Sequence, residues 1–529
     1  MTTKEEIAPR PEQLGTNVNS AKPLWKTLGW AALSGLLLAG ALPNLDWGWM
    51  AWFALVPLLA VFPLKNTRTA VAHGVTLAAF YSLGMVYWVA VFAAHLIGPA
   101  LSVLGWALLT LCESFFFAVW AAGAQWLCRQ SNSWAWRLGA PALWVIAAEW
   151  WRQLGSLGLS WGDLAYTQHL ALPILQITKL TGIWGLSFLI VLVNVALTEI
   201  VKTRRAGKFS AAVSALVALT LVYGIVALRT ENLRPAFVAA ALQGNIDESV
   251  QQTPAYTERV MQVYEAQSQE AAARGAALTV WPETAYPGYL LNSNDQRARI
   301  GRLAVSQHQT MVIGSVEYDW GKRKNANSLF LMDARGNITS RYQKRQLVPF
   351  GEYVPGRDWF PALDKLHVTP ADMEAGADTQ PLMDGGPLIG KIGAALCFES
   401  SYARLTREQA ARGAGLLVVS TDDTWFGHTS EVRQHSAIAA VRAAETDRYL
   451  IRSAATGISQ ILDPTGRVLA QAGLNRPAVV SAPVQSRTTL TLYVRWGDWF
   501  VGFCALLLAG VSVRWPTNAR VRRAGTSRN

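Results

Sequence analysis

Apolar residues fill long runs over the first 230 residues of the chain and return in one further run near its end. A helix that crosses a bilayer needs about 20 mostly apolar residues, with a range of about 17 to 25. On that criterion the sequence predicts a membrane α-helical bundle of about eight spans. The predicted spans are residues 25–43, 47–63, 69–93, 100–128, 134–151, 183–201, 209–228 and 493–513.

Between about residues 235 and 486 the pattern changes to the mixed composition of a soluble domain. Short apolar stretches bounded by turn residues indicate buried strands, and longer stretches of helical composition separate them. This alternation predicts an α/β domain whose functional side chains lie at strand ends. The predicted strands are 237–244, 276–281, 311–316, 327–332, 389–397, 416–420, 449–455 and 458–463, and the predicted helices are 254–274, 402–413 and 431–447.

The two patterns divide the chain into five parts. A polar N-terminal segment, expected to be disordered, precedes a bundle of about seven spans. A soluble domain, one C-terminal transmembrane helix and a basic tail follow. The boundaries are 1–23, 24–230, 231–488, 489–513 and 514–529.

The basic residues, which give the chain a net charge of +12, cluster beside the apolar runs. That distribution indicates membrane orientation and not a nucleic-acid groove. Lys65 and Arg68 follow the second run, for example, whereas the connections 44–46 and 94–99 contain no Lys or Arg. Because basic connections stay in the cytoplasm, the alternation places both termini there and residues 229–492 outside. No nucleic-acid partner is expected.

The stretch between two of these runs, residues 152–182, is less apolar and is rich in glycine and aromatic residues. We expect it to be a loop that lies on the soluble domain or in the membrane interface. Glu149 and Arg152 stand three residues apart at the end of a span, and a local structural ion pair is the expected arrangement.

Only one of the four cysteines, Cys397, belongs to the soluble domain, so that domain cannot form an internal disulfide. The others, Cys112, Cys128 and Cys504, lie in or beside apolar runs. No CxxC occurs and the seven histidines are scattered, so no metal site is predicted. A lone thiol in an oxidising compartment suggests a reactive cysteine. The alternative is a small buried core residue.

Two further polar residues complete a plausible reaction centre with Cys397. Glu283 follows the strand ending Val280-Trp-Pro, and Lys344 opens a long polar segment. A thiol needs a base such as a carboxylate, and acyl transfer needs a cation near the developing oxyanion. Each residue also has an ordinary structural interpretation: Glu283 as a helix N-cap, Lys344 as a surface charge, and Glu352 as a salt-bridge partner.

Five segments together resemble the nitrilase (carbon–nitrogen hydrolase) superfamily. They are Leu242-Gln-Gly-Asn-Ile, Trp281-Pro-Glu283-Thr-Ala, Lys344-Arg-Gln-Leu-Val-Pro-Phe-Gly-Glu352-Tyr-Val-Pro, Cys397-Phe-Glu399 and Asp423-Thr-Trp425-Phe-Gly. With the many spans, the chain resembles the membrane-embedded branch of that superfamily, the apolipoprotein N-acyltransferases of the bacterial inner membrane. The resemblance covers nearly the whole chain, and the segment from Lys344 is its most specific part.

The resemblance implies an α-β-β-α sandwich in the periplasm and a Glu–Lys–Cys triad. In that family Glu283 is the general base, Lys344 stabilises the tetrahedral intermediate, and Cys397 carries the acyl group as a thioester. Glu352 and Glu399 match further required positions. We expect Glu352 to orient Lys344 or Glu283, and Glu399 to hold the loop after Cys397.

The implied reaction has two steps and needs no cofactor. Cys397 takes an acyl chain from a phospholipid, the sn-1 ester of phosphatidylethanolamine, and passes it to the α-amine of the diacylglyceryl-cysteine of an apolipoprotein. The bundle is expected to hold the soluble domain over the leaflet that supplies both lipids. Phe398, Trp425 and Phe426 are candidate substrate contacts.

The sequence departs from the family pattern in three places. Phe398 stands where Tyr is common, so no role for that hydroxyl is carried over. No Trp follows Leu242–Ile246 within the next several residues, so an aromatic substrate contact is not assigned there. Asp422 stands where Asn is usual. None of these differences touches Glu283, Lys344 or Cys397.

Two rival functions stay open at this point. A membrane-tethered nitrilase-type amidase uses the same triad with water as second nucleophile. Large apolar side chains near the site argue against it, and Trp425-Phe426 and Trp359-Phe360 are candidates, although both pairs also suit an ordinary core. A transporter or receptor needs charges within its spans, of which the sequence offers few beyond Glu113, Glu149 and Glu199.

Overall fold

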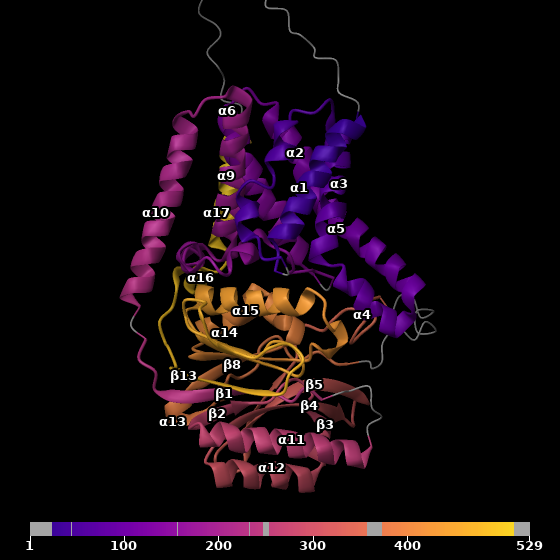
Figure 1. The fold of residues 1–529 in the computed structure, drawn as a ribbon, viewed down its shortest axis with the longest axis vertical. Coiled ribbons are helices and arrows are strands. Elements are labelled where there is room, and N and C mark those ends of the chain that lie inside the picture. The colour runs from indigo at the N-terminus through magenta and orange to yellow at the C-terminus, as the bar shows by residue number, and fades with distance from the viewer. Residues whose placement is uncertain are drawn as a thin grey trace, which may run out of the picture.

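The computed structural model describes residues 24–43, 45–155, 157–231, 233–246, 253–356 and 373–512. It has a helical bundle above a two-sheet sandwich, with the last helix, α17, returning into the bundle (Figure 1). The predicted N-terminal segment, the basic tail and the pair Trp359-Phe360 lie outside the described residues.

Helices occupy every one of the predicted spans. Four of them, α1, α5, α9 and α10, are long and apolar enough to cross a membrane alone, by length and composition. The pair α3 and α4 passes the same test together but is bent by 61°. The count of about eight spans stays a prediction. The bundle helices are α1 (Leu24–Ala41), α2 (Val56–Ala60), α3 (Thr67–Met85), α4 (Trp88–Ile97), α5 (Pro99–Cys128), α6 (Ser133–Leu143), α9 (Ile183–Thr203), α10 (Lys208–Thr230) and α17 (Trp499–Ser512).

Three further predicted spans are built from shorter pieces. The second consists of a 3₁₀ helix (Gly48–Trp52) and α2. The fifth continues from α6 into a π-helical stretch (Trp144–Trp150) after Pro141, as expected where a proline removes a backbone donor. The eighth is divided at Gly497, whose φ of +62° separates α16 (Leu492–Trp496) from α17.

The described residues between 152 and 182 lie against the soluble domain, one of the two placements predicted, with Ser160 contacting Ser401. They form several short helical turns. These include 3₁₀ turns at Trp151–Gln153 and Leu164–Gln168, α7 (Leu172–Leu175) and α8 (Thr178–Thr181). The expected ion pair between Glu149 and Arg152 is wrong. Arg152 Nη2 lies 2.7 Å from Asp163 Oδ1 and its Nη1 lies 3.2 Å from Glu113 Oε2. Two carboxylates that converge from other parts of the chain outcompete the neighbour in sequence.

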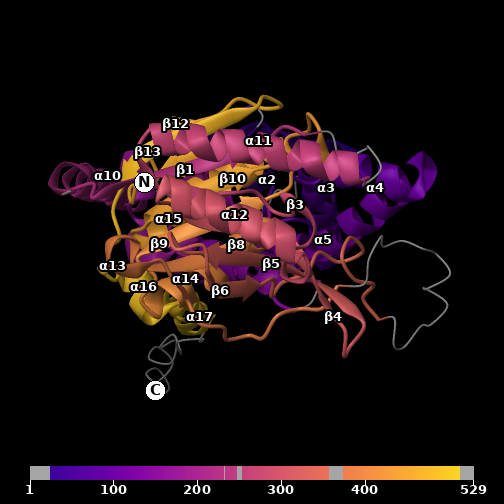
Figure 2. The ribbon, with the colours of Figure 1, turned by 90° about the horizontal axis from the view of Figure 1, so that it is seen from below.

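The soluble domain is an α/β sandwich of two sheets that pack face to face (Figures 1 and 2). The first sheet has the order β13-β1-β2-β4-β5-β6, with β3 beside β4, and the second has the order β12-β11-β10-β9-β8-β7. Their strands are β1 (Phe237–Gln243), β2 (Ala276–Val280), β3 (Tyr286–Tyr289), β4 (Thr310–Asp319), β5 (Lys324–Met332), β6 (Ile338–Gln343), β7 (Met383–Asp384), β8 (Lys391–Leu396), β9 (Leu416–Thr421), β10 (Tyr449–Ala454), β11 (Gln460–Leu462), β12 (Val468–Gln471) and β13 (Ala478–Val484).

Helices cover both outer faces of the sandwich. Packed against the first sheet are α11 (Pro254–Ala273) and α12 (Asn294–Gln307), and against the second are α14 (Ala403–Ala411) and α15 (Glu431–Thr446) (Figure 1). A further short helix, α13 (Gly386–Ile389), precedes β8. The implied α-β-β-α arrangement is therefore confirmed, and the eight predicted strands and three predicted helices are all present.

One helix, α15, joins the two halves of the molecule. Ala439 and Ala443 pack on the second sheet, whereas Ile438, Val441 and Ala444 belong to the apolar cluster of the bundle. All of its residues except Arg433 and Ser436 are buried. A helix buried on all sides needs protein on all sides, so the sandwich and the bundle form one continuous packed structure.

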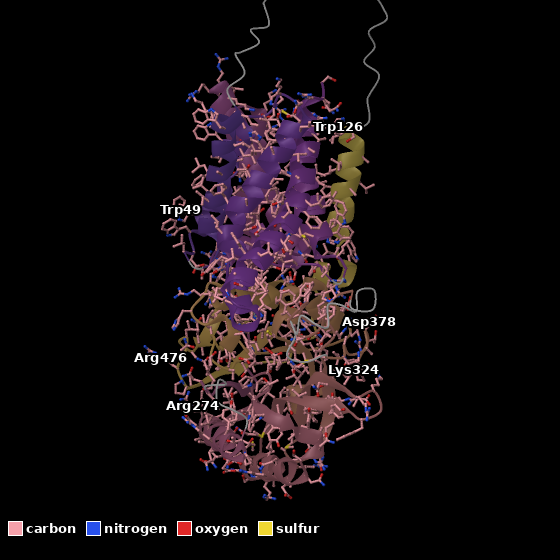
Figure 3. The ribbon with its side chains drawn as sticks, turned by 90° about the vertical axis from the view of Figure 1, so that its right-hand side faces the viewer. Trp49, Trp126, Arg274, Lys324, Asp378 and Arg476 are labelled. Atoms are coloured by element: carbon pink, nitrogen blue, oxygen red, sulfur yellow. The ribbon has the colours of Figure 1, made fainter. Side chains whose placement is uncertain are left out.

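The surfaces of the two halves differ in chemistry (Figure 3). Charged side chains project from the sandwich, among them the labelled Arg274, Lys324 and Arg476. Exposed tryptophans project from the bundle, where Trp126 is 50% and Trp49 is 61% exposed. Exposed tryptophan is typical of the interface between hydrocarbon and water, which agrees with a membrane-embedded bundle.

Candidate active site

Cys397 follows β8 directly and begins a 3₁₀ turn, Cys397–Ser401. It is buried, and its φ is +51°. The left-handed region costs a non-glycine residue about 1–3 kcal/mol unless the surrounding structure holds it. Such strain is typical of functional sites, so the backbone itself argues against a passive core cysteine.

Glu283 lies just after β2 and is 5% exposed. Its Oε1 accepts hydrogen bonds from Asn327 Nδ2 at 2.6 Å and from Lys344 Nζ at 3.1 Å. Its Oε2 accepts one from the backbone N–H of Asp422 at 2.9 Å. Glu283 is therefore a fixed, buried carboxylate and not a helix N-cap.

Lys344 follows β6 and is 1% exposed, so it is not a surface charge. Its Nζ lies between two carboxylates, 2.7 Å from Glu352 Oε1 and 3.1 Å from Glu283 Oε1. The second oxygen of Glu352 accepts the backbone N–H of Val348 at 2.8 Å. Glu352 is thus anchored and holds the ammonium group, as expected for a residue that orients Lys344.

The environment fixes the protonation of the three groups. Burial raises the pKa of Cys397, and the charge of Glu283 raises it further, against an opposing effect of Lys344. Burial would lower the pKa of Lys344, but Glu283 and Glu352 more than reverse that, so the group stays an ammonium. Burial raises the pKa of Glu283, with Lys344 opposing. Cys397 is therefore a neutral thiol within the electrostatic influence of a carboxylate whose own basicity is raised.

Glu399 is fully buried and binds backbone on both sides of the site. Its Oε1 accepts the N–H groups of Arg345 at 2.6 Å and Gln346 at 3.0 Å, and its Oε2 accepts the N–H of Leu396 at 2.8 Å. It was expected to hold the loop after Cys397. The structure instead shows it joining the loop after Lys344 to the strand end before Cys397, so it sets the spacing of those two residues.

The candidate aromatic contacts pack against the bundle half. The rings of Phe398 and Trp161 stack with centroids 5.8 Å apart. Phe426 lies 5.5 Å from Phe92 of α4, and Trp425 lies 6.3 Å from the same ring. Trp425 stays 43% exposed, so it retains free apolar surface, whereas Phe398 is engaged within the protein.

Other residues of the site carry weaker sequence signals. Asn327 lies in the apolar strand β5 and is 2% exposed. An amide at an inward-facing position of such a strand is the one sequence feature that could have indicated its place in the site. A cluster of Asp423, Glu431, His435 and Arg452 is buried behind the cysteine. Only Asp423 belongs to a motif noted in the sequence, because the other members are brought together from α15 and β10.

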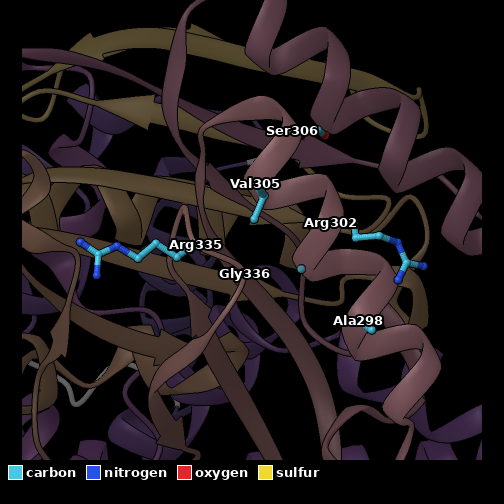
Figure 4. A pocket seen from close by; sticks show the side chains of 7 residues that line it. Ala298, Arg302, Val305, Ser306, Arg335 and Gly336 are labelled. Atoms are coloured by element: carbon cyan, nitrogen blue, oxygen red, sulfur yellow. The ribbon is translucent and has the colours of Figure 1, made fainter.

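A cavity of about 310 Å³ lies away from these residues, between α12 and the turn before β6 (Figure 4). Its two arginines, Arg302 and Arg335, point in opposite directions (Figure 4). The cavity therefore offers no converging polar groups and is not part of the candidate active site. It is lined by Ala298, Gly301, Arg302, Val305, Ser306, Arg335 and Gly336.

Comparison with known families matches both halves of the chain. The family model described as carbon–nitrogen hydrolase matches residues 238–492. The model described as the apolipoprotein N-acyltransferase N-terminal domain matches residues 34–196.

Individual proteins are similar over nearly the full length. A protein of Geobacter metallireducens named apolipoprotein N-acyltransferase is 34% identical over 91% of this chain and 93% of its own. One of the same name from Gloeobacter violaceus is 33% identical over 92% of this chain and 94% of its own. Among solved structures, an amidase from Nesterenkonia sp. AN1 superposes with a TM-score of 0.40 at 18% identity, over 52% of this chain and 99% of that chain.

Proposed function

The chain belongs to the apolipoprotein N-acyltransferase family, and on that premise we propose that it carries an acyl group from a phospholipid to an apolipoprotein through a thioester on Cys397. The acceptor is the α-amine of a diacylglyceryl-cysteine, and the donor is the sn-1 ester of a phospholipid such as phosphatidylethanolamine. The observation that carries the proposal is the position of Lys344 Nζ, buried between Glu283 and Glu352.

In the first half-reaction Glu283 accepts the thiol proton of Cys397. The thiolate attacks the ester carbonyl and forms a carbon–sulfur bond, and the negative charge on the tetrahedral oxygen lies near the ammonium of Lys344. Collapse breaks the carbon–oxygen ester bond and leaves an acyl thioester. The departing glycerol oxygen receives the proton from Glu283 and leaves as a lysophospholipid. A preorganised cation that stabilises the oxyanion makes a large contribution to the rate of acyl transfer.

In the second half-reaction the amine of the acceptor attacks the thioester. Glu283 takes the proton that the nitrogen loses, and an amide bond replaces the carbon–sulfur bond. The leaving thiolate is reprotonated from Glu283, which restores the starting state. The two substrates therefore react in turn, as in ping-pong kinetics. This chemistry uses only side chains of the chain.

A membrane-tethered amidase would use the same catalytic residues, but its small soluble substrate would not need the helical bundle. Phe426 and Trp425 lie against Phe92 of α4, and Ser160 of the bundle-side loop lies 2.6 Å from Ser401 Oγ, beside the nucleophile. Contacts of the bundle with the turn of Cys397 favour substrates that arrive through the membrane. We propose a location in the inner membrane with the sandwich in the periplasm.

Intact-protein mass spectrometry tests the proposal. The protein is incubated with phosphatidylethanolamine alone and then with a diacylglyceryl peptide. We expect an adduct of acyl mass that C397A cannot form and that the acceptor removes. C112A, which changes an exposed cysteine of α5, is the matched control and should form the adduct. If the wild-type protein forms none, but hydrolyses a small amide, the amidase function replaces this one.

A further inference from the structure

A buried group of four charged side chains lies directly behind Cys397 and has no part in the reaction steps above. We call Asp423, Glu431, His435 and Arg452 the back cluster. Each is at most 2% exposed. They come from the loop after β9, from α15 and from β10, so two carboxylates and two basic groups meet in the interior. Charges this deep are costly unless they are paired.

His435 connects the back cluster to the nucleophile. Its Nε2 lies 3.1 Å from the carbonyl oxygen of Cys397 and 2.7 Å from Ser400 Oγ. Ser400 Oγ itself donates to the Cys397 carbonyl at 3.0 Å. A carbonyl oxygen only accepts, and the serine proton is already used. The Nε2 atom must therefore carry the proton that satisfies these two oxygens.

The other ring nitrogen faces acids. His435 Nδ1 lies 3.4 Å from Glu431 Oε1 and 3.6 Å from Asp423 Oδ1, and Arg452 Nη2 pairs with Asp423 Oδ2 at 2.8 Å. With both nitrogens protonated, two cations balance two carboxylates. Burial and Arg452 lower the pKa of His435, but the bonds to Asp423 and Glu431 outweigh them and raise it. The Trp161 ring, 5.6 Å away, closes the remaining side.

We propose that His435 is a positioning residue: its Nε2–H holds the carbonyl of Cys397 and so fixes the left-handed backbone that directs the thiol toward Glu283 and Lys344. This rests on the proposed role of Cys397 as nucleophile. A residue with φ of +51° relaxes unless its surroundings hold it. Among the described residues, His435 and Ser400 are the side chains that donate to this carbonyl, and the acids of the back cluster hold His435 in turn.

A second link runs from the back cluster to the thiol. Thr421 Oγ1 donates to Asp423 Oδ1 at 2.8 Å, and Thr421 lowers the pKa of the Cys397 thiol against the larger effect of burial. The back cluster therefore contacts the nucleophile at its carbonyl, and through Thr421 it borders the electrostatic environment of the thiol.

An alternative interpretation of the back cluster is a metal site, because Asp423, Glu431 and His435 have ligand atoms within 4.8 Å of one another. Arg452 already neutralises Asp423 at 2.8 Å. The two acids favour an imidazolium at His435, and a histidine protonated on both nitrogens has no lone pair for a metal. The contacts therefore favour positioning over metal binding.

The test measures the reactivity of the thiol, which needs no substrate. Purified H435L, H435Q and wild-type protein are treated with iodoacetamide, and alkylation of Cys397 and Cys112 is followed by mass spectrometry. H435L keeps bulk but cannot donate, so Cys397 should react about tenfold more slowly or worse, with Cys112 unchanged. H435Q keeps an N–H at the same reach and should stay near the wild-type rate. H73Q, the same change at a buried histidine of α3, is the matched control.

Acylation gives the second readout. H435L should lower the single-turnover acylation rate at saturating phospholipid and leave phospholipid binding unchanged. Wild-type alkylation and acylation rates in H435L would overturn the proposal, as would a stoichiometric metal that H435L loses. If H435L does not fold, S400A replaces it, and an unchanged alkylation rate in S400A overturns the proposal. Absence of an acyl adduct in the wild-type protein would refute the proposed function alone, because alkylation still reports on His435.

Discussion

Single residues decide the chemistry of this protein, and the environment of Lys344 is the clearest case. Its ammonium is 1% exposed and bridges two carboxylates. We expect K344M to lower the single-turnover acylation rate by about a hundredfold or more, because the cation acts on charge that develops only in the transition state. Phospholipid binding, measured by a separate titration, should change little.

A matched control for that variant is K322M, which removes a lysine that is 62% exposed and pairs with Glu374 at the surface. It should acylate at the wild-type rate. If K344M weakened phospholipid binding and left the saturated acylation rate intact, Lys344 would be a headgroup contact and not an oxyanion donor.

The charge of Asp422 acts on Glu283, the proposed general base. Burial has the largest effect on Glu283 and raises its pKa, and the charge of Lys344 opposes this. The negative charges of Glu352 and Asp422 raise the pKa further. D422N removes one of these charges and keeps the shape, so the pKa of Glu283 should fall. Because the base must be ionised to act, the acid limb of the acylation rate should move to lower pH. A pH–rate profile measures this, with the surface variant D384N as control, and a shift to higher pH would contradict it.

Elements act on the site through close backbone contact, as β4 does at Gly314. A Cβ atom on this residue would lie 2.1 Å from the carbonyl oxygen of Pro282 and 2.8 Å from Cα of Glu283. G314A must therefore displace the loop that carries Glu283. A displacement of about 1 Å can cost about a hundredfold in rate, so single-turnover acylation should fall by that order.

The control for this change is G105A on α5, where an added Cβ meets no atom within 4 Å among the described residues. It should leave acylation unchanged. If G314A and the wild-type protein acylated at the same rate, the loop that carries Glu283 would be able to move aside without loss of activity.

At the scale of the whole molecule, four side chains join the bundle to the sandwich. Asp447 lies 2.8 Å from both Lys179 and Arg487, and Glu231 pairs with the same two cations. Burial raises the pKa of Asp447, but Lys179 and the other partners lower it by a larger amount. The pKa of Asp447 is therefore below its ordinary value. A depressed pKa contributes stability above the unfolded-state pKa, and that stability is lost as the pH falls through the folded-state value.

D447N should therefore destabilise the protein by about 3–5 kcal/mol at neutral pH, as expected when one partner of a buried pair is removed. Thermal unfolding in detergent measures this, and the difference from the wild-type protein should shrink in acid. E258Q, which breaks the surface pair with Arg299, should change the melting temperature little. If D447N and E258Q lowered the melting temperature equally, the buried ion pairs between bundle and sandwich would contribute no more stability than a surface pair.

Topology is also a property of the whole molecule. The alternation of Lys and Arg places Arg234 outside the cytoplasm and the C-terminus inside it. Reporter fusions at these two positions should give opposite signals. A cytoplasmic signal at Arg234 would contradict the orientation and the periplasmic location of the sandwich.

The sequence by itself predicted most strands and helices of the sandwich and its three candidate catalytic side chains. Alternation of short apolar stretches and helical stretches located eight strands and three helices of the sandwich, because buried strands and amphipathic helices leave local patterns. It missed the short strands β3 and β7, the helix α12, and β6, β12 and β13, whose mixed exposure or proline leaves a weaker pattern. Glu283, Lys344 and Cys397 stood out because their segments are distinctive over several residues.

Only the tertiary structure decided the partners. It brought Lys344 to Glu283 across 61 residues, paired Arg152 with Asp163 and Glu113 instead of Glu149, and placed His435 behind Cys397. The physical reason is that periodicity reports which face of its own element a side chain occupies. The partner on that face is supplied by another segment, and its identity depends on how sheets, helices and bundle pack together.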